Sequence, residues 1–463
     1  MTKRIFGISE KVWWIVLIWI TVLLGVLLRT IRADEYPVSQ NDDGLFYAWV
    51  GNSVWDDFTK PTSLSIFEDS ETLFWRSQYK DFDPRDRFGF RMSEPWFDSP
   101  ILGSILVSLP ARLMGYTGFG QYPHMLVRLP AILVSGVTLV LTYLLGKELF
   151  GKREGFWGLL MLSVWPLAAF SQRQSYLENF ITPLLLLGLL GVLRLKKKRK
   201  KWSLIICLAA LVSGWIKFSG FFVPAILAYF LSLKKEWRVF WKVIGFFGLS
   251  LTLYLFYGHV VGGEAFWQTI GNQVGRGSYL LSWFRVLEGP GIYETIKDSW
   301  WYLGWFGIFW LANKNKKNKF LLTNVVLWML VVFLTSGRNN TSPWYWYPIY
   351  PFLALAMGKL TYSLYENLSF LKLAVFLFLG FGHFELAGYE FSSNMLRILA
   401  VLILGFSYIY ELGLIKWKNF SKKLVMVLIG LMVISGALAT MKYPEIVCGD
   451  GRCLSPEKVW VEE

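Results

Sequence analysis

The sequence predicts an all-α polytopic membrane protein, and three observations lead to that fold class. Of the 463 residues, 54% are hydrophobic and 18% aromatic, which exceeds the apolar share of an ordinary soluble domain. Apolar runs recur along the chain, and a helix needs about 20 apolar residues to cross a bilayer. The net charge of +15 is concentrated in short loops between these runs, so it indicates membrane topology rather than nucleic-acid binding.

The first apolar run, residues 12–31, predicts a membrane-spanning signal anchor. It is too long for the hydrophobic part of a cleavable signal peptide and lacks a small-residue cleavage site. Residues 1–11 carry Lys3, Arg4 and Lys11. The N-terminus is therefore expected in the cytoplasm.

The distribution of charge assigns the loops to sides of the membrane. Five short loops hold 22 of the 47 basic residues: 147–153, 194–201, 234–242, 314–319 and 416–423. Loop 32–98 instead holds 14 of the 32 acidic residues against 7 basic ones. Since short basic loops stay in the cytoplasm, the five loops are expected inside and loop 32–98 outside.

This assignment predicts thirteen membrane spans. If the short apolar stretch 101–114 also crossed, two basic loops would fall outside, so it is expected to be an interfacial or re-entrant helix. Residues 52–58 and 62–79 of the first outer loop are predicted as short helices on the membrane surface. The predicted spans are 12–31, 125–146, 155–171, 179–194, 202–217, 220–233, 242–258, 300–312, 320–335, 346–362, 371–388, 395–413 and 424–441.

The domain organisation follows from these spans. Residues 1–441 form one transmembrane domain with a second outer loop at 259–299, and residues 442–463 form a short tail outside. In that tail Cys448 and Cys453 are close enough in sequence for a small disulfide, although free or metal-bound thiols stay open. Cys207 lies in an apolar run and is expected to be packing.

Polar residues suited to catalysis or ligand binding collect on the outer side in this topology. Asn41-Asp42-Asp43-Gly44 follows the first span, and two adjacent carboxylates beside a membrane can supply a general base and a neighbour that positions it. A solvated turn is the alternative, because Asn, Asp and Gly also favour turns. The outer-side group is Asp42, Asp43, Glu94, Asp98, Arg173, Glu178, Lys217, His259, Arg276, Arg285 and Arg338.

The cations of this group are candidates for binding a lipid phosphate. Lys217 divides two short apolar segments, so it is either a point charge for a phosphate or a snorkelling lysine. Arg338, just before the aromatic cluster 344–347, could do the same, and that cluster is expected mainly as an interfacial belt. Arg173 and Glu178 are either functional or an ion pair that closes their loop. Arg276 and Arg285 are the remaining candidates.

A metal site has weaker support. The three histidines have no metal-ligand spacing. His259 precedes the second outer loop, and a divalent metal ion held by His259 and Asp98 is one interpretation.

Several motifs, in order over about residues 40–225, resemble those of the GT-C glycosyltransferases. The stretch 41–47 is similar to that family's acidic motif after the first helix, and Phe97-Asp98-Ser99-Pro100 to the element that opens its juxtamembrane helix. The remaining similar stretches are 128–131, 143–151, 171–178 and 217–220. The branch with the greatest resemblance is that of the protein O-mannosyltransferases and lipid A aminoarabinose transferases.

The resemblance implies a GT-C fold and sugar transfer, with inversion, from a polyprenyl-phosphate donor to an acceptor hydroxyl. Asp42 takes the position of the general base with Asp43 beside it, Glu178 that of a second acid, and Asp98 that of a metal-binding Glu in some members. The acceptor is a protein, glycan or lipid, and a divalent metal ion is an open cofactor. A flippase or transporter for lipid-linked sugars is the alternative function, although no internal repeat supports it.

Overall fold

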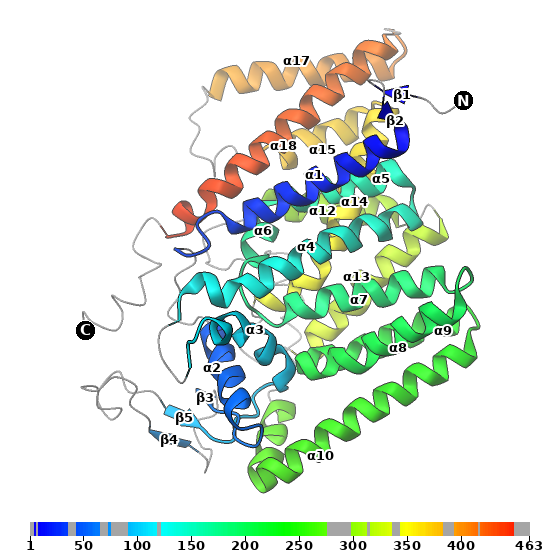
Figure 1. The fold of residues 1–463 in the computed structure, drawn as a ribbon. Coiled ribbons are helices and arrows are strands. Elements are labelled where there is room, and N and C mark those ends of the chain that lie inside the picture. The colour runs from blue at the N-terminus through cyan, green and yellow to red at the C-terminus, as the bar shows by residue number, and fades with distance from the viewer. Residues whose placement is uncertain are drawn as a thin grey trace.

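Long helices in a stacked bundle make up most of the computed structural model (Figure 1). The structure describes residues 4–5, 8–35, 43–64, 73–75, 91–117, 122–275, 298–312, 315–335, 343–382, 393–414 and 417–448. The first half contains α1 (Glu10–Thr30), α2 (Asp43–Asp56), α3 (Ile101–Leu113), α4 (His124–Leu149), α5 (Lys152–Val164), α6 (Pro166–Gln172), α7 (Glu178–Arg194), α8 (Arg199–Ile216) and α9 (Phe222–Leu233). The second half contains α10 (Trp237–Gly275), α12 (Ser299–Leu311), α13 (Lys316–Thr335), α14 (Tyr350–Glu366), α15 (Phe370–Gly380), α17 (Ser393–Glu411) and α18 (Lys418–Cys448).

The predicted spans coincide with these helices, and the all-α membrane fold is confirmed. Each of the thirteen predicted spans overlaps a described helix, although α15 covers only residues 371–380 of the span 371–388 and residues 383–388 lie outside the described part of the chain. Five described helices are individually long and apolar enough to cross a membrane, namely α1, α4, α10, α13 and the 419–442 part of α18. The number of crossings stays a prediction.

Some spans are broken helices. The predicted span 155–171 consists of α5 and α6, which are separated by Trp165 in an extended conformation, and Pro166 opens α6. Proline suits the first turn of a helix and cannot continue a preceding one, so it fixes this break. A 3₁₀ turn η1 (Phe218–Phe221) joins α8 to α9, and a second one, η2 (Pro343–Ile349), leads into α14.

Helix α10 corrects the predicted boundary at residue 258. It continues to Gly275 through a sharp kink at Gly263, whose φ of 52° lies in the left-handed region that favours glycine. Residues 259–275, expected as loop, are thus helical. The end of α10 lies against the first outer segment, because Tyr257 Oη donates to the carbonyl of Phe58 at 2.9 Å and Gln273 Nε2 donates to that of Asp98 at 2.8 Å.

The predicted surface helix over 62–79 is wrong where the structure describes that segment. Strands β3 (Ser63–Leu64), β4 (Leu73–Trp75) and β5 (Arg91–Ser93) form a small antiparallel sheet in the order β3-β5-β4. The prediction over 52–58 is confirmed in part, since α2 extends to Asp56. A further two-stranded ladder of β1 (Arg4–Ile5) and β2 (Ile8–Ser9) precedes α1.

The predicted interfacial helix 101–114 is α3, which packs closely on α2. A Cβ at Gly51 of α2 would meet the carbonyl of Ser104 and lie 2.6 Å from Ser108 Cβ, so only glycine allows this approach. In Figure 1, α2, α3 and the sheet β3–β5 lie together at one end of the bundle. That end carries the first outer loop, and it is where the polar candidates were expected to meet.

Candidate functional site

A buried ion pair lies where α7 begins and α8 ends. The Oε1 atom of Glu178 is 2.8 Å from Nζ of Lys217, and the two side chains are 0% and 10% exposed. Glu178 is the first residue of α7, and Lys217 follows α8 in an extended conformation before η1. The expected alternative, an Arg173–Glu178 pair, is not formed.

Helix α3 fixes the spacing of this pair. Gly103 of α3 packs against the two residues that precede the charged ones: a Cβ there would lie 2.7 Å from Leu177 Cδ2 and 3.0 Å from the carbonyl oxygen of Ile216. The close approach requires glycine. It lets α3 contact the chain on both sides of the ion pair.

Glu178 has capacity for a further ligand. Its Oε1 faces the Lys217 ammonium at 2.8 Å, whereas Oε2 has no hydrogen-bond partner among the described residues. A buried carboxylate with an unfilled acceptor position is costly unless it is paired, and here Lys217 supplies the charge while Oε2 stays without a donor. The carboxylate can therefore accept a hydrogen bond from a hydroxyl group of a bound molecule.

Two tyrosines, which the sequence did not single out, complete this site. Tyr47 lies one helical turn after Asp43 in α2 and is 6% exposed. Burial raises the pKa of the Tyr47 phenol, Lys217 lowers it, and Asp43 and Glu178 raise it, so all three charges act on the same hydroxyl. The ring of Tyr345 lies 5.2 Å from Nζ of Lys217, a distance at which a cation and an aromatic face attract.

The aromatic cluster 344–347 is packed inside the protein, which corrects the expected interfacial belt. Trp346 and Tyr347 are 3% and 0% exposed. The Trp344 ring stacks on Tyr176 with 4.4 Å between the ring centroids, and Trp328 Nε1 donates to the carbonyl of Tyr345 at 2.8 Å. These contacts fix Tyr345 beside Lys217.

Arg173 is fully buried and bound to main-chain oxygens. Its Nη1 donates to the carbonyl of Ile31 at 3.1 Å and its Nη2 to that of Leu28 at 3.2 Å. Two other buried arginines lie at the same end of α1: Arg29, a residue of α1, donates to Gly25, Ser163, Leu162 and Gln172, and Arg128 of α4 donates to the carbonyl of Ala33 at 2.7 Å. Because carbonyls at a helix C-terminus lack intrahelical donors, these cations stabilise the point from which the chain leads to Asp42.

Asp98 and His259 do not form a metal site with other described residues. Asp98 lies before α3 and is 8% exposed, whereas His259 is exposed and accepts from Trp267 Nε1 at 3.2 Å. No group of three His, Cys, Asp or Glu side chains suited to a metal ion occurs among the described residues. Two candidate ligands alone are a poor fit for a divalent ion, which takes six or more oxygen ligands or about four mixed ones.

Several predicted residues lie outside the described part of the chain. These are Asp42, Arg276, Arg285, Arg338 and the second cysteine of the expected disulfide, Cys453. Asp43, which is described, opens α2 instead of lying in a solvated turn. The site that the structure brings together is therefore Asp43, Tyr47, Glu178, Lys217 and Tyr345.

Comparison with known proteins agrees with this architecture. Residues 98–261 match the family model of the dolichyl-phosphate-mannose-protein mannosyltransferases, and no curated protein matches the chain. The matched segment contains Asp98, Glu178 and Lys217.

Among solved structures, ArnT from Cupriavidus metallidurans bound to undecaprenyl phosphate is similar, with a TM-score of 0.58 and 14% identity over 96% of this chain and 79% of that one. The same protein in the apo state matches with a TM-score of 0.51 and 15% identity, over 96% of this chain and 78% of that one. The oligosaccharyltransferase AglB from Archaeoglobus fulgidus, in complex with an inhibitory peptide and a dolichol-phosphate, is less similar, with a TM-score of 0.47 and 13% identity over 92% and 56%.

The predicted resemblance and enzyme class agree with these matches, since the family model describes glycosyltransferases and the matched fold is theirs. The chain is an integral membrane protein with the GT-C fold, and it is similar to the protein mannosyltransferases and to ArnT among the glycosyltransferases of that fold.

Proposed function

We propose that the chain transfers a sugar from a polyprenyl-phosphate donor to an acceptor hydroxyl at the outer face of the membrane, with inversion and with Asp42 as general base. The observation that supports this most is the buried Glu178–Lys217 pair beside Tyr47, one turn from Asp43 in α2. Carboxylates and a fixed cation thus converge at one end of the bundle. A lipid phosphate and an acceptor could both reach that end.

The proposed reaction is a single displacement. The Asp42 carboxylate takes the proton of the acceptor hydroxyl as its oxygen attacks the anomeric carbon. The bond from that carbon to the phosphate oxygen breaks, and the polyprenyl phosphate leaves with the electron pair. A base held within hydrogen-bond reach contributes on the order of 10²–10⁴-fold to such a step.

The charged residues have the following roles in this proposal. Asp43 positions its neighbour Asp42 at the start of α2. Glu178 accepts a hydrogen bond from a substrate hydroxyl through Oε2, which has no donor among the described residues. Lys217 and Arg338 stabilise the charge that develops on the leaving phosphate, with Arg276 and Arg285 as the next candidates. Arg173, which is bound to α1, positions the loop rather than the phosphate.

The orientation is part of the proposal and comes from the loop charges. With the short basic loops in the cytoplasm, the N-terminus lies inside and α1 runs outward to the acidic loop. The partners would then be a lipid-linked donor in the outer leaflet and a protein, glycan or lipid acceptor. The likeness to ArnT bound to undecaprenyl phosphate supports a lipid-phosphate donor.

The test compares Asp42→Asn with wild type in purified protein, using a panel of dolichyl- and undecaprenyl-phosphate sugars and measuring release of the polyprenyl phosphate. Asn keeps the size of Asp but cannot accept the proton, so we expect donor binding to persist while transfer falls at least about 10²-fold. Asp57→Asn, in the exposed turn after α2, is the matched control and should leave the rate unchanged.

Normal transfer by Asp42→Asn would exclude it as the base. An inactive Asp43→Asn beside an active Asp42→Asn would assign the base to Asp43. Movement of a lipid-linked sugar across the membrane without release of polyprenyl phosphate would instead support a flippase.

A further inference from the structure

A second candidate site lies at the other end of α7. This helix has 17 residues, so its last residue, Arg194, is roughly 24 Å along the axis from Glu178. A cavity of about 320 Å³ opens here between the ends of α7 and α9, which falls in the usual size range of ligand pockets. Its lining residues are Val192, Leu193, Leu195, Lys196, Lys234 and Glu236.

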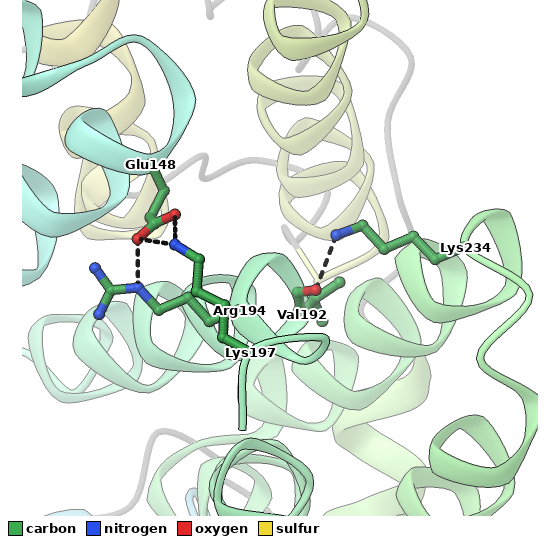
Figure 2. Close-up of polar contacts among 5 residues, drawn as sticks. All are labelled: Glu148, Val192, Arg194, Lys197 and Lys234. Carbon is green, nitrogen blue, oxygen red and sulfur yellow. Dashed lines mark hydrogen bonds and ion pairs between the residues drawn. The ribbon is translucent and has the colours of Figure 1, made fainter. Parts of the chain in front are cut away.

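The carboxylates near this cavity are already paired with cations outside its wall. Glu148 of α4 binds Arg194 Nε at 2.7 Å and Lys197 Nζ at 3.0 Å, as Figure 2 shows. Glu236, the one acid in the lining, binds Arg199 Nη2 at 2.8 Å. The lining therefore holds two lysines against one carboxylate, and that carboxylate is shared with Arg199.

Those two lysines keep hydrogen-bond donors available. Lys234 Nζ donates one bond, to the carbonyl of Val192 at 2.8 Å, which fixes the ammonium at the end of α7 (Figure 2). An ammonium has three N–H groups, and the described residues accept only this one. Lys196 is exposed and makes no side-chain hydrogen bond or ion pair within the described part of the chain.

The two ammonium groups also repel one another. Burial lowers the pKa of Lys234, Lys196 lowers it further, and Glu236 raises it. Two like charges at one cavity favour an anion that lies between them. The cavity thus has the electrostatics of an anion site before any ligand binds.

The remaining lining is apolar, and this selects the kind of anion. Val192, Leu193 and Leu195 belong to the end of a helix that crosses the bundle, so the cavity lies where acyl chains meet head groups. The adjoining loop 194–201 carries seven basic residues, which places this end at the cytoplasmic leaflet by the positive-inside bias. Basic pockets between membrane helices on that side are known to bind anionic lipid head groups.

We propose that the cavity between the ends of α7 and α9 binds the phosphate of an anionic phospholipid in the cytoplasmic leaflet, with Lys196 and Lys234 as its ligands and the three apolar residues against the glycerol and first acyl carbons. This binding is separate from sugar transfer at the opposite end of α7. It ties the ends of α7 and α9 to the membrane that surrounds them.

The test measures phosphatidylglycerol bound to the purified full chain by native mass spectrometry, with phosphatidylcholine in parallel. Wild type should retain phosphatidylglycerol selectively. Lys196→Gln should bind it about five-fold more weakly, since one lysine near an anionic surface contributes on the order of a factor of five in affinity. Lys234→Gln should do the same, but it also loses its bond to Val192, so Lys196→Gln decides the outcome.

Lys200→Gln is the matched control because it removes the same charge from the same loop without lining the cavity. An equal loss in Lys200→Gln and Lys196→Gln would show diffuse attraction by the loop and overturn the proposal. Equal binding of phosphatidylcholine would overturn it too. Leu193→Ala should weaken the binding of phosphatidylglycerol but not that of inorganic phosphate. Displacement of the lipid by millimolar inorganic phosphate would identify a free-anion site instead.

Discussion

Glu178 and Lys217 form an ion pair of 2.8 Å in the interior of the bundle, between the first residue of α7 and the extended residue that follows α8. Removing a charge from water is costly, and only a close partner offsets that cost. The pair therefore couples the start of α7 to the break between α8 and η1. Its loss should affect both folding and transfer.

Lys217→Met should destabilise the protein by about 3–5 kcal/mol, because it leaves the Glu178 carboxylate buried without its partner. Thermal unfolding in detergent measures the effect. Lys60→Met, which breaks the exposed Lys60–Asp57 pair of 4.0 Å, is the control and should cost about 1 kcal/mol or less. Adding Glu178→Leu to Lys217→Met should restore stability without restoring transfer. A Lys217→Met protein as stable as wild type would show that the pair is not needed for folding.

Arg173→Met should lower both stability and transfer rate, since two charge-assisted hydrogen bonds to the end of α1 are lost at about 1.5–3 kcal/mol each. Apparent donor KM should change less than kcat, because Arg173 positions a loop rather than the donor. Arg173→Lys should recover part of both quantities. Arg238→Met, at an exposed position of α10, should stay within about 0.5 kcal/mol of wild type. If Arg173→Met changed only the donor KM, Arg173 would instead be a ligand of the donor phosphate.

Gly358→Ala should destabilise the contact between α14 and α5. The new Cβ would meet the backbone nitrogen of Gly158 and lie 2.6 Å from the carbonyl carbon of Trp157, and backbone atoms cannot move aside. Gly248→Ala, where no atom lies within 4 Å, should be neutral or stabilise by up to about 1 kcal/mol. Equal melting temperatures for both variants would show that the two helices separate easily.

A cysteine at position 198 should react with a membrane-impermeant maleimide only after the cells are opened, because the loop 194–201 is expected in the cytoplasm. The background is Cys448→Ser with Cys453→Ser, since Cys207 is buried. A cysteine at position 60, in the first outer segment, should react in intact cells. The opposite pattern would invert the topology and move the phospholipid cavity to the outer leaflet.

Local sequence patterns predicted the helices because apolar runs of about 20 residues have few alternatives in a bilayer. They failed over 62–79, where Leu64 pairs with Met92 in a sheet. That pairing depends on a strand that is distant in sequence, so a pattern read over a short stretch of sequence cannot predict it. The continuation of α10 past residue 258 was missed for a related reason, because it depends on packing of Gly262 and Phe266 against the distant Phe97.

The candidate site was predictable only in its charged residues. Glu178 and Lys217 stood out as charges among apolar neighbours, but the partner suggested by sequence distance was Arg173. Tyr47 and Tyr345 resembled any aromatic residue near a membrane, because their value comes from the cation and carboxylates that tertiary packing brings to them.

The buried arginines fix the end of α1 relative to the neighbouring helices. Arg29 of α1 donates to main-chain oxygens of α5 and to Gln172 of α6, while Arg128 and Arg173 donate to carbonyls at and just after the end of α1. One inserted residue would advance the chain by about 1.5 Å and rotate it by about 100°, which would break these contacts together. The place where the chain leaves the bundle after α1 is therefore set by contacts with α4, α5 and α6.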